Sequence, residues 1–508
     1  MTPISALRRQ AESNPDGTAF IFADETWTYA RVAVEADRCG QAMLARGVKA
    51  GDRVALHMAN LPELVIAFYA CFRIGAIAAP LNARLKTAEL QPLLTRLEPA
   101  LYLGQAQLYP QIAGIEPEIL PREARYVIGD TAELARPWAE LFEGAEEMTL
   151  PGDPDPEAVT VLMTTSGTTG LPKFVAHSAA TASAILERLR SLGFDDEHVV
   201  INAMPMMHGS GFMLTVCSIY HGRPVILLER FDANEVLDAI ETYGGSWFLG
   251  MPFAFSDMMR AQREHPRSVE TLRMCLAAGD AIPVQVQEEF SELFGIDLLN
   301  LWGATEGIGS LLHGLSFGPV CRVAPDAEIR LVDEDGMPVA RGEVGELLLR
   351  GPNMAMGYWK GPGNIDPLAS DGWYHTGDLM RLGDDDEIWF VARKKDLIVR
   401  GGSNISPLEV ERVLMAHPAV RDAAVVGVPD PVLGQRVAAV VELGGKPRRA
   451  GILDDILVTT RAQLADYKVP ERLTAVSEIP RNNLGKIDRN LLVTMLTEAP
   501  AKRMVERV

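Results

Sequence analysis

A ten-residue segment, Thr164 to Lys173, combines the side chains and glycines that bind polyanions. It reads Thr-Thr-Ser-Gly-Thr-Thr-Gly-Leu-Pro-Lys and directly follows a strand-like apolar run, Val159 to Met163. Glycines let the backbone approach a phosphate, hydroxyls donate hydrogen bonds to its oxygens, and the lysine adds positive charge. A flexible surface loop is the alternative, but this composition directly after a buried strand favours phosphate binding. The candidate phosphate-binding residues are Thr165, Ser166, Gly167, Thr168, Thr169, Gly170 and Lys173.

The nucleoside-triphosphatase spacing Gly-x-x-x-x-Gly-Lys-Ser/Thr is absent from this segment. It resembles instead the signature of the adenylate-forming superfamily, which contains acyl-coenzyme A synthetases, luciferases and nonribosomal adenylation domains. Further stretches match that family in the expected order, so the resemblance covers nearly the whole chain. They are Asn300 to Gly307, Tyr374 to Asp378 with Arg393, Arg400 to Pro407, and Pro480 to Ile487.

The stretch from Asn300 to Gly307 contains an aromatic-Gly-x-Thr-Glu motif. Trp302 offers a flat face for adenine, Thr305 a hydroxyl for the α-phosphate, and Glu306 a hard oxygen ligand for Mg²⁺. A lone tryptophan near a helix start is usually a core residue, so this motif indicates nucleotide binding only together with the other matched stretches. The resemblance adds further nucleotide-binding residues, although the family more often has a small residue where Asp280 stands. They are Gly279, Asp280, Ala281 and Gly303.

Asp378 ends the matched pentapeptide Tyr374 to Asp378, and Arg393 follows in the chain. A carboxylate is a natural acceptor for two ribose hydroxyls, and the resemblance assigns this role to Asp378, assisted by Arg393. An aspartate after glycine would ordinarily be interpreted as a turn residue. The match of the whole pentapeptide favours the binding role.

Lys486 follows Gly485 in a polar loop near the end of the sequence. A lone lysine in such a loop is ordinarily a solvated surface residue, but the resemblance makes Lys486 the catalytic lysine. A carboxylate that attacks the α-phosphate of ATP brings two anions together, so positive charge is needed where they meet. Lys486 and Mg²⁺ on Glu306 would supply that charge. Coenzyme A is the expected thiol that then takes the acyl group.

The second half-reaction requires a different surface, because Lys486 would cover the carbonyl that the thiol attacks. Family members rotate the small domain about a hinge residue, and Lys395 stands at that position. The loop Arg400 to Pro407, with Gly402, would then replace Lys486 and line the thiol channel. A solvated linker at Lys395 is compatible with the hinge.

An acid-binding pocket is expected where Met204 to Met213 contains the family's Pro-x-x-His. Soft Met and Phe side chains suit an apolar acyl or aryl group, and His208 would lie at the pocket mouth. Some of these methionines are expected in the core instead. The candidate lining residues are Met207, Gly209, Phe212, Leu249, Gly250, Ala278 and Gly307.

Arg188 bears on the choice of acid, because aromatic-acid members of the family place a pocket side chain there. If it points inward, the substrate should carry a polar or anionic group. We expect instead one solvated helix edge made of Glu187, Arg188 and Arg190. Activity should then rise with acyl length or ring size, and dicarboxylates and amino acids should be poor substrates.

The elements that position these motifs alternate between helical and strand-like patterns, which predicts wound α/β units. Short alternating segments from about Ala327 predict a small β subdomain. Helices are predicted at Ala30 to Arg46, Leu61 to Phe72, Ala180 to Leu192, Val236 to Tyr243, Pro407 to Ala416 and Ile452 to Leu464. Strands are predicted at Arg53 to Met58, Gly75 to Pro80, Val159 to Met163, Val199 to Ala203, Ser246 to Leu249, Glu328 to Val332, Gly345 to Arg350, Asp378 to Leu382, Glu387 to Val391, Ala423 to Val428 and Val437 to Leu443.

The charged run Arg393 to Asp396 marks the predicted domain boundary. Residues 1–394 would form a large N-terminal adenylation domain of several α/β subdomains. Residues 395–508 would form a small, mobile α+β domain, with the hinge near Lys395. The fold class is therefore α/β.

Composition excludes several classes of protein. Of the 508 residues 47% are hydrophobic and 23% charged, as in ordinary globular proteins, so disorder is excluded as the main state. The net charge of −20 repels nucleic acid and anionic membranes. The five scattered cysteines indicate buried thiols in a reducing cytoplasm, and no secretory leader or integral membrane contact is expected.

The sequence thus predicts an AMP-forming acyl- or aryl-coenzyme A synthetase of fatty-acid or aromatic-acid metabolism. Its substrates would be ATP with Mg²⁺, a small carboxylic acid and coenzyme A. The alternative is a stand-alone adenylation enzyme that loads a carrier protein. A luciferase-like oxygenase or a silent binder is disfavoured, because every catalytic position is present. The acid, the pathway and the oligomeric state, including a homodimer, stay open.

Overall fold

The structure is a computed structural model, and it describes residues 1–130, 135–165, 172–192, 194, 198–383, 386–444, 451–482 and 486–498. Most of the predicted phosphate-binding loop, Ser166 to Gly170, lies outside these residues, as does Gly485. The two flanks of that loop, Thr165 and Lys173, are described.

The first sheet of the N-terminal part has nine strands in the described residues. They are β3 (Arg53–His57), β4 (Ile77–Pro80), β5 (Leu101–Gln105), β6 (Arg125–Ile128), β7 (Arg136–Pro137), β8 (Val159–Thr165), β9 (Lys173–Ser178), β19 (Gly357–Gly361) and β20 (Asn364–Asp366). Their spatial order is β20-β19-β9-β8-β4-β3-β5-β6-β7. Strands β8 and β9 are antiparallel neighbours, so both flanks of the predicted loop end at one edge of the sheet.

The second large sheet has seven strands in the described residues. They are β1 (Thr18–Phe22), β2 (Glu25–Thr28), β10 (Val200–Asn202), β11 (Val225–Leu227), β12 (Trp247–Gly250), β13 (Met274–Ala278) and β14 (Leu298–Leu301). The order is β14-β13-β12-β10-β11-β1-β2, with parallel pairing from β1 to β14. Because parallel strands end at one edge, the segments after β13 and β14, which carry Asp280 and Trp302, leave the sheet side by side.

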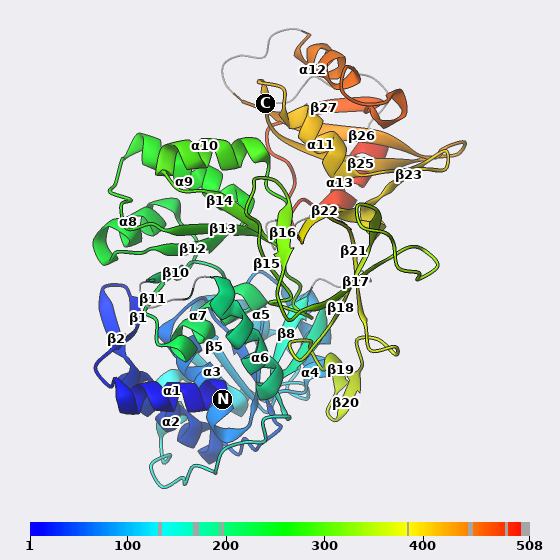
Figure 1. The fold of residues 1–508 in the computed structure, drawn as a ribbon. Helices are drawn as coiled ribbons and strands as arrows, with labels where there is room; N and C mark the ends of the chain where they lie inside the picture. Colours follow the sequence, from blue (N-terminus) through cyan, green and yellow to red (C-terminus); the bar gives the residue numbers. More distant parts are fainter. Residues whose placement is uncertain are drawn as a thin grey trace.

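Helices cover both sheets in wound α/β fashion (Figure 1). In the N-terminal part the described α-helices are α1 (Pro3–Ser13), α2 (Tyr29–Ala45), α3 (Pro62–Ile74), α4 (Thr87–Leu97), α5 (Pro110–Ala113), α6 (Ala179–Leu189), α7 (Gly209–His221), α8 (Ala233–Tyr243), α9 (Pro252–Glu264) and α10 (Val284–Phe294). Short 3₁₀ segments are η1 (Ala106–Leu108), η2 (Arg122–Ala124), η3 (Trp138–Phe142) and η4 (Arg190–Leu192). One core cluster joins residues of both sheets to α1, α2, α3, α6 and α7.

Local sequence signals explain where these helices begin and end. The side chain of Thr28 accepts a hydrogen bond from the backbone N–H of Arg31 and caps α2. Helix α3 begins with proline and ends at Gly75, whose φ of 72° is a left-handed conformation that glycine adopts easily. Every residue of α3 except Glu63 is buried, which explains its continuous apolar sequence. None of the helices in the described part of the chain has the length and apolar character that a bilayer crossing requires.

The predicted β subdomain is a six-stranded antiparallel sheet. Its described strands are β15 (Leu311–His313), β16 (Val320–Val323), β17 (Glu328–Val332), β18 (Val344–Arg350), β21 (Tyr374–Leu382) and β22 (Glu387–Arg393). Strand β21 begins four residues before the predicted start, so the pentapeptide that ends at Asp378 belongs to a strand. In the sheet β21 pairs with β22.

The C-terminal part has its own sheet and two core clusters. It follows the 3₁₀ segment η5 (Lys394–Asp396) and stands above the N-terminal part in Figure 1. The described strands are β23 (Ile398–Arg400), β24 (Ser403–Ile405), β25 (Val420–Asp430), β26 (Gly434–Leu443) and β27 (Arg472–Val476). The helical segments are α11 (Pro407–Met415), α12 (Ile452–Arg461), η6 (Asp466–Lys468) and α13 (Arg489–Glu498). This agrees with a mixed α/β chain of a large and a small domain, while the boundary at 394/395 stays a prediction.

Candidate active site

Asp378 lies at the centre of the candidate site. The pairing of β21 with β22 puts it opposite Arg393, with 3.3 Å between Asp378 Oδ1 and Arg393 Nε. The indole Nε1 of Trp302 donates a hydrogen bond to Asp378 Oδ2 at 2.8 Å. Burial raises the pKa of the Asp378 carboxyl, while Arg393, the Trp302 hydrogen bond and Lys486 act in the opposite direction. Trp302 therefore orients this carboxylate, a contact that its expected role in stacking did not include.

Lys486 comes from the C-terminal part and reaches the same place. A methyl group on Gly279 would lie 4.0 Å from Lys486 Cε, and that glycine has a φ of 89°. Burial lowers the pKa of the Lys486 ammonium and Arg393 adds to this, whereas the carboxylates of Asp280 and Asp378 raise it. The structure thus brings together the predicted lysine and the predicted ribose-binding and adenine-binding segments.

A reciprocal pair of backbone contacts holds Lys486 in its loop. Its N–H donates to Asn482 Oδ1 at 3.2 Å, and the Asn482 N–H donates to the Lys486 carbonyl at 2.7 Å. An isolated bridge between Arg481 and Ile487 lies on either side of them. These contacts join the two described ends of the loop, at Asn482 and Lys486.

Glu306 is bound by two tyrosines. Its Oε1 accepts a hydrogen bond from the Tyr358 hydroxyl at 3.0 Å, and the Tyr374 hydroxyl is also hydrogen-bonded to it. Burial, followed by the charge of Glu306, raises the pKa of both phenols, so both stay protonated and donate. The Lys173 ammonium lies 4.5 Å from the centre of the Tyr358 ring. A chain of contacts therefore connects the phosphate-loop lysine to Glu306.

Sequence reasoning missed both tyrosines and His177. Tyr374 opens the matched pentapeptide and could have been found there, whereas Tyr358 and His177 carry no local signal. His177 lies fully buried on β9, and its Nε2 donates to the Thr305 carbonyl at 2.8 Å. Burial lowers the pKa of His177 to about 4, so the ring is neutral at pH 7. His177 thus positions the segment that carries Thr305.

His208 stands directly before α7 and is near Lys486 and Arg84. Burial first, then those two cations, lowers the pKa of His208 to about 4, which makes the imidazole neutral at pH 7. Gly209 follows, and a methyl group there would lie 3.1 Å from Ile308 Cδ1 and 3.7 Å from Thr305 Oγ1. The start of α7 therefore lies against the segment that carries Thr305 and Ile308.

The other predicted lining residues divide between the site and the core. Phe212 belongs to the core, with its ring 4.9 Å from Phe68 and 6.2 Å from Phe72. Met207 is also buried, and its sulfur accepts a hydrogen bond from the Ala83 N–H at 3.3 Å. The remaining candidates lie at the carboxyl ends of β12 and β13 or in the segment around Thr305. They are Leu249, Gly250, Ala278, Gly303 and Gly307.

Two predictions concern exposed residues, of which Lys395 is close enough to Lys486 for its charge to lower the pKa of that ammonium. Gly402 is exposed in the turn between β23 and β24, with no atom within 4 Å of a methyl group built on it. Lys395 is exposed in η5, between β22 and β23. Lys486 therefore lies among the predicted site residues in this structure, whereas Gly402 lies outside them.

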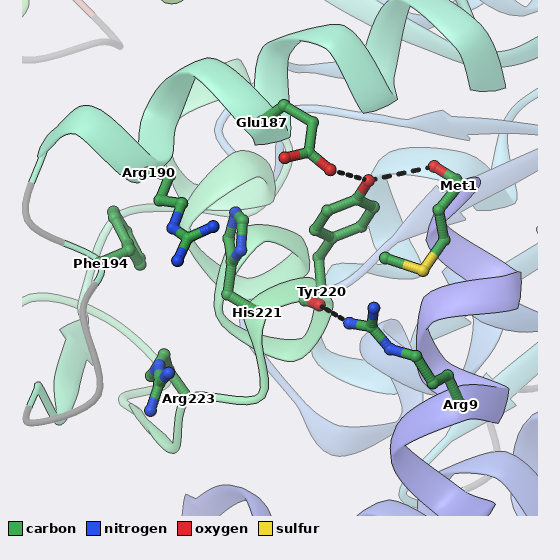
Figure 2. A pocket seen from close by; sticks show the side chains of 8 residues that line it. All are labelled: Met1, Arg9, Glu187, Arg190, Phe194, Tyr220, His221 and Arg223. Carbon is green, nitrogen blue, oxygen red and sulfur yellow. Dashed lines mark hydrogen bonds between the residues drawn. The ribbon is translucent and has the colours of Figure 1, made fainter.

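The predicted solvated edge of α6 is wrong for one of its three residues. Glu187 and Arg190 are exposed and line an outer cavity of about 350 Å³ (Figure 2). Arg188 is buried, with only 7% of its side chain exposed. Arg188 lies against Gly309 and near Gly351, which are distant in the sequence. The pattern of the helix alone could therefore not predict that Arg188 is buried.

Two fully buried neutral histidines predict an acid-sensitive fold. Burial lowers the pKa of His57 and of His177 to about 4 from the ordinary 6.5. Between pH 4 and 6.5 the unfolded chain binds more protons, so the free energy of unfolding is highest above pH 6.5 and falls with decreasing pH. At pH 5 each histidine should cost about 2 kcal/mol.

Urea unfolding at pH 7.5 and pH 5 measures this effect. His177→Gln should reduce the loss of stability on acidification by about 2 kcal/mol. His265→Gln, at an exposed position, should leave the loss unchanged. An equal loss in the wild type and in His177→Gln would contradict the prediction.

Comparison with known families shows two matches. The profile of the AMP-binding enzymes matches residues 7–359, and the profile of the AMP-binding enzyme C-terminal domain matches residues 409–486. Among curated relatives, the medium-chain fatty-acid–CoA ligase of Escherichia coli is 31% identical, covering 96% of this chain and 88% of the relative. The 2-succinylbenzoate–CoA ligase of Bacillus subtilis is 30% identical, covering 96% of both chains.

Solved structures agree with this. An anthranilate CoA ligase in complex with anthranoyl-AMP has a TM-score of 0.88 at 25% identity, covering 97% of both chains. The o-succinylbenzoate CoA synthetase of Bacillus subtilis, with its acyl-adenylate intermediate, has a TM-score of 0.81 at 27% identity, covering 98% of this chain and 99% of that one.

Proposed function

This chain belongs to the family of AMP-binding enzymes, and from that membership we propose the reaction and the residue roles that follow. It is an ATP-dependent acyl- or aryl-coenzyme A synthetase, an acid–thiol ligase. A carboxylate and ATP give acyl-adenylate and pyrophosphate, and coenzyme A then gives the thioester and AMP. The observation that carries the proposal is the convergence of Lys486 on Asp378 and Trp302 from a separate part of the chain.

In the first half-reaction a carboxylate oxygen forms a bond to the α-phosphorus while the bond to the β,γ-pyrophosphate breaks. Asp378, oriented by Trp302 and Arg393, accepts hydrogen bonds from the ribose hydroxyls. Adenine lies along Gly279 to Ala281. Lys486 and the Thr305 hydroxyl stabilise the negative charge on the α-phosphate. Lys173, with the loop that precedes it, holds the departing pyrophosphate.

In the second half-reaction the thiolate sulfur attacks the acyl carbonyl, and AMP leaves with the oxygen that came from the carboxylate. His208 is neutral at pH 7, because its pKa is lowered to about 4. A neutral imidazole at the pocket mouth adds no charge beside the carbonyl. The small domain must first turn at Lys395, since Lys486 covers that carbonyl.

Mg²⁺ is the metal that fits the donors present. Glu306 offers one carboxylate, and its partners are two phenols that donate to it. The described residues hold no group of three or more His, Cys, Asp or Glu side chains that could cage a metal. One carboxylate completed by phosphate oxygens and water is the coordination that Mg²⁺ prefers. When bound, the ion supplies positive charge to the phosphates.

The alternative, an enzyme that loads a carrier protein, is not favoured. The curated relatives named above act on coenzyme A by name. We place the protein in the cytoplasm, a proposal supported by its five cysteines, which are all buried and unpaired.

Pyrophosphate release tests the function against a panel of fatty and aromatic acids, with and without coenzyme A. We expect acid-dependent release and, with coenzyme A, one thioester and one AMP per pyrophosphate. A free pantetheinylated carrier protein should not replace coenzyme A. Formation of ADP and inorganic phosphate, or turnover with the carrier protein alone, would contradict the proposal.

A further inference from the structure

Arg188, on α6, is a buried cation with an unused donor. Its Nη2 donates to the Asp326 carbonyl at 3.0 Å and lies 3.1 Å from Asp326 Oδ2. Its Nη1 is buried and donates to no group in the part of the chain that the structure describes. Buried donors in folded proteins almost always have a partner. The free N–H groups of Nη1 therefore point to a ligand.

Asn353 presents the complementary atom nearby. Its Nδ2 donates to the Ile308 carbonyl at 2.8 Å and to Ser310 Oγ at 2.9 Å, which fixes the orientation of the amide. Its Oδ1 is buried and accepts no hydrogen bond from a described residue. A methyl group on Gly351 would lie 2.9 Å from Asn353 Oδ1 and 3.7 Å from Arg188 Nη2. Because Gly351 has no side chain, none fills the space beside Asn353 Oδ1 and Arg188 Nη2, which we call the polar corner.

The corner adjoins the segment that carries the catalytic residues. A methyl group on Gly309 would lie 3.2 Å from Arg188 Cβ, so the arginine packs against the end of the segment that begins at Trp302. The same segment faces Gly209 through Ile308 and Thr305. Trp302 is at the nucleotide end, bonded to Asp378. Arg188 and Gly209, the latter at the start of the expected acid pocket, therefore contact one segment, from Thr305 to Gly309.

The two neighbours of Arg188 on the helix edge face elsewhere. Figure 2 shows Glu187 and Arg190 at the outer cavity, with Glu187 accepting a hydrogen bond from the Tyr220 hydroxyl at 2.6 Å. Arg190 makes no ion pair with any described residue. Arg190 lies on the same edge but lines the outer cavity and not the expected acid pocket. It therefore serves as a matched control.

We propose that Arg188 and Asn353 select acids whose end remote from the reacting carboxylate carries an oxygen that accepts a hydrogen bond from Arg188 Nη1. The inference rests on the proposed function and specifies its substrate class. Because Asp326 already balances the guanidinium charge, a hydroxyl or carbonyl oxygen fits better than a second carboxylate. A hydroxyl would also donate to Asn353 Oδ1. On this proposal the pocket is polar at its end, whereas the sequence led us to expect apolar lining.

Isosteric acids test the proposal, because they differ only at the remote atom. The pairs are 5-oxohexanoate with 5-methylhexanoate, and 4-acetylbenzoate with 4-isopropylbenzoate. We expect kcat/KM for thioester formation to favour the carbonyl member of the accepted pair about tenfold or more. Arg188→Met, which keeps the length and removes the donors, should abolish or reverse that ratio. Arg190→Gln should leave it unchanged.

The outcomes separate the inference from the function on which it rests. A wild-type ratio near one overturns the inference without any variant, as does a ratio that Arg188→Met retains. If Arg188→Met does not fold, Arg188→Lys, which keeps the charge but loses the fork of donors, must lower the ratio. Turnover of the methyl-branched acids alone leaves the function standing and refutes the selectivity. Absence of pyrophosphate release with every acid tested contradicts the function itself.

Discussion

Lys486→Ala is expected to reduce acyl-adenylate formation by about 100-fold or more, the loss typical of one preorganised electrostatic contact. The lysine side chain is half-buried, and the carboxylates of Asp280 and Asp378 are near enough to raise the pKa of its ammonium where the α-phosphate of ATP would lie. Charge stabilisation is strongest in such a desolvated place. Conversion of supplied acyl-adenylate to thioester should keep its wild-type rate, because the proposed mechanism removes Lys486 from the site for that step.

Separate assays of the two half-reactions measure this difference. Acid-dependent exchange of labelled pyrophosphate into ATP reports adenylation, and thioester formation from synthetic acyl-adenylate reports the second step. Lys49→Ala, at an exposed position, is the matched control and should change neither rate. An equal loss in both half-reactions would show that Lys486 does not act in adenylation alone.

Lys395→Pro is expected to have the opposite effect. Proline fixes φ near −65°, so the small domain should be held in one orientation. The orientation described here places Lys486 at the site, so adenylation should persist. Thioester formation should fall by about 100-fold, because the coenzyme A thiol would be misplaced by more than an ångström.

Lys395→Ala is the control for this variant. It removes the same charge but leaves φ free, so both half-reactions should continue at close to wild-type rates. Rapid-quench measurements of each step distinguish the two variants. If Lys395→Pro retains both rates, the chain turns at another residue.

Local sequence patterns predicted the helices and strands whose structure depends mainly on the spacing of their own apolar residues. Helices α2 and α3 appear, within two residues at each end, where the apolar spacing predicted them. Helix α6 stops at Leu189, three residues short of its predicted end, because the chain continues as the 3₁₀ segment η4. Strand β1 joins β11, about 200 residues away, and no local pattern encodes such a pairing. The sequence alone could therefore not predict which distant strands pair, or in which register.

The candidate site divides in the same way. Motif matching identified Lys486 and Asp378, and the structure brings them together. Tyr358 reaches Glu306 only because β19 pairs with β9, a tertiary contact. Arg188 was misjudged because its burial is due to Gly309 and to Asp326, which lie far along the chain. Contacts made by glycine, or by residues that fold onto a helix from elsewhere, leave no periodic signal.

The central claim is that a carboxylate oxygen attacks the α-phosphorus of ATP, and isotope transfer tests it most directly. An accepted acid labelled with ¹⁸O in both carboxylate oxygens is incubated with the enzyme, ATP and coenzyme A. The masses of AMP and pyrophosphate are then measured by mass spectrometry. We predict one ¹⁸O in each AMP and none in pyrophosphate, because the oxygen that forms the mixed anhydride leaves with AMP. Label in inorganic phosphate, or unlabelled AMP, would contradict the account.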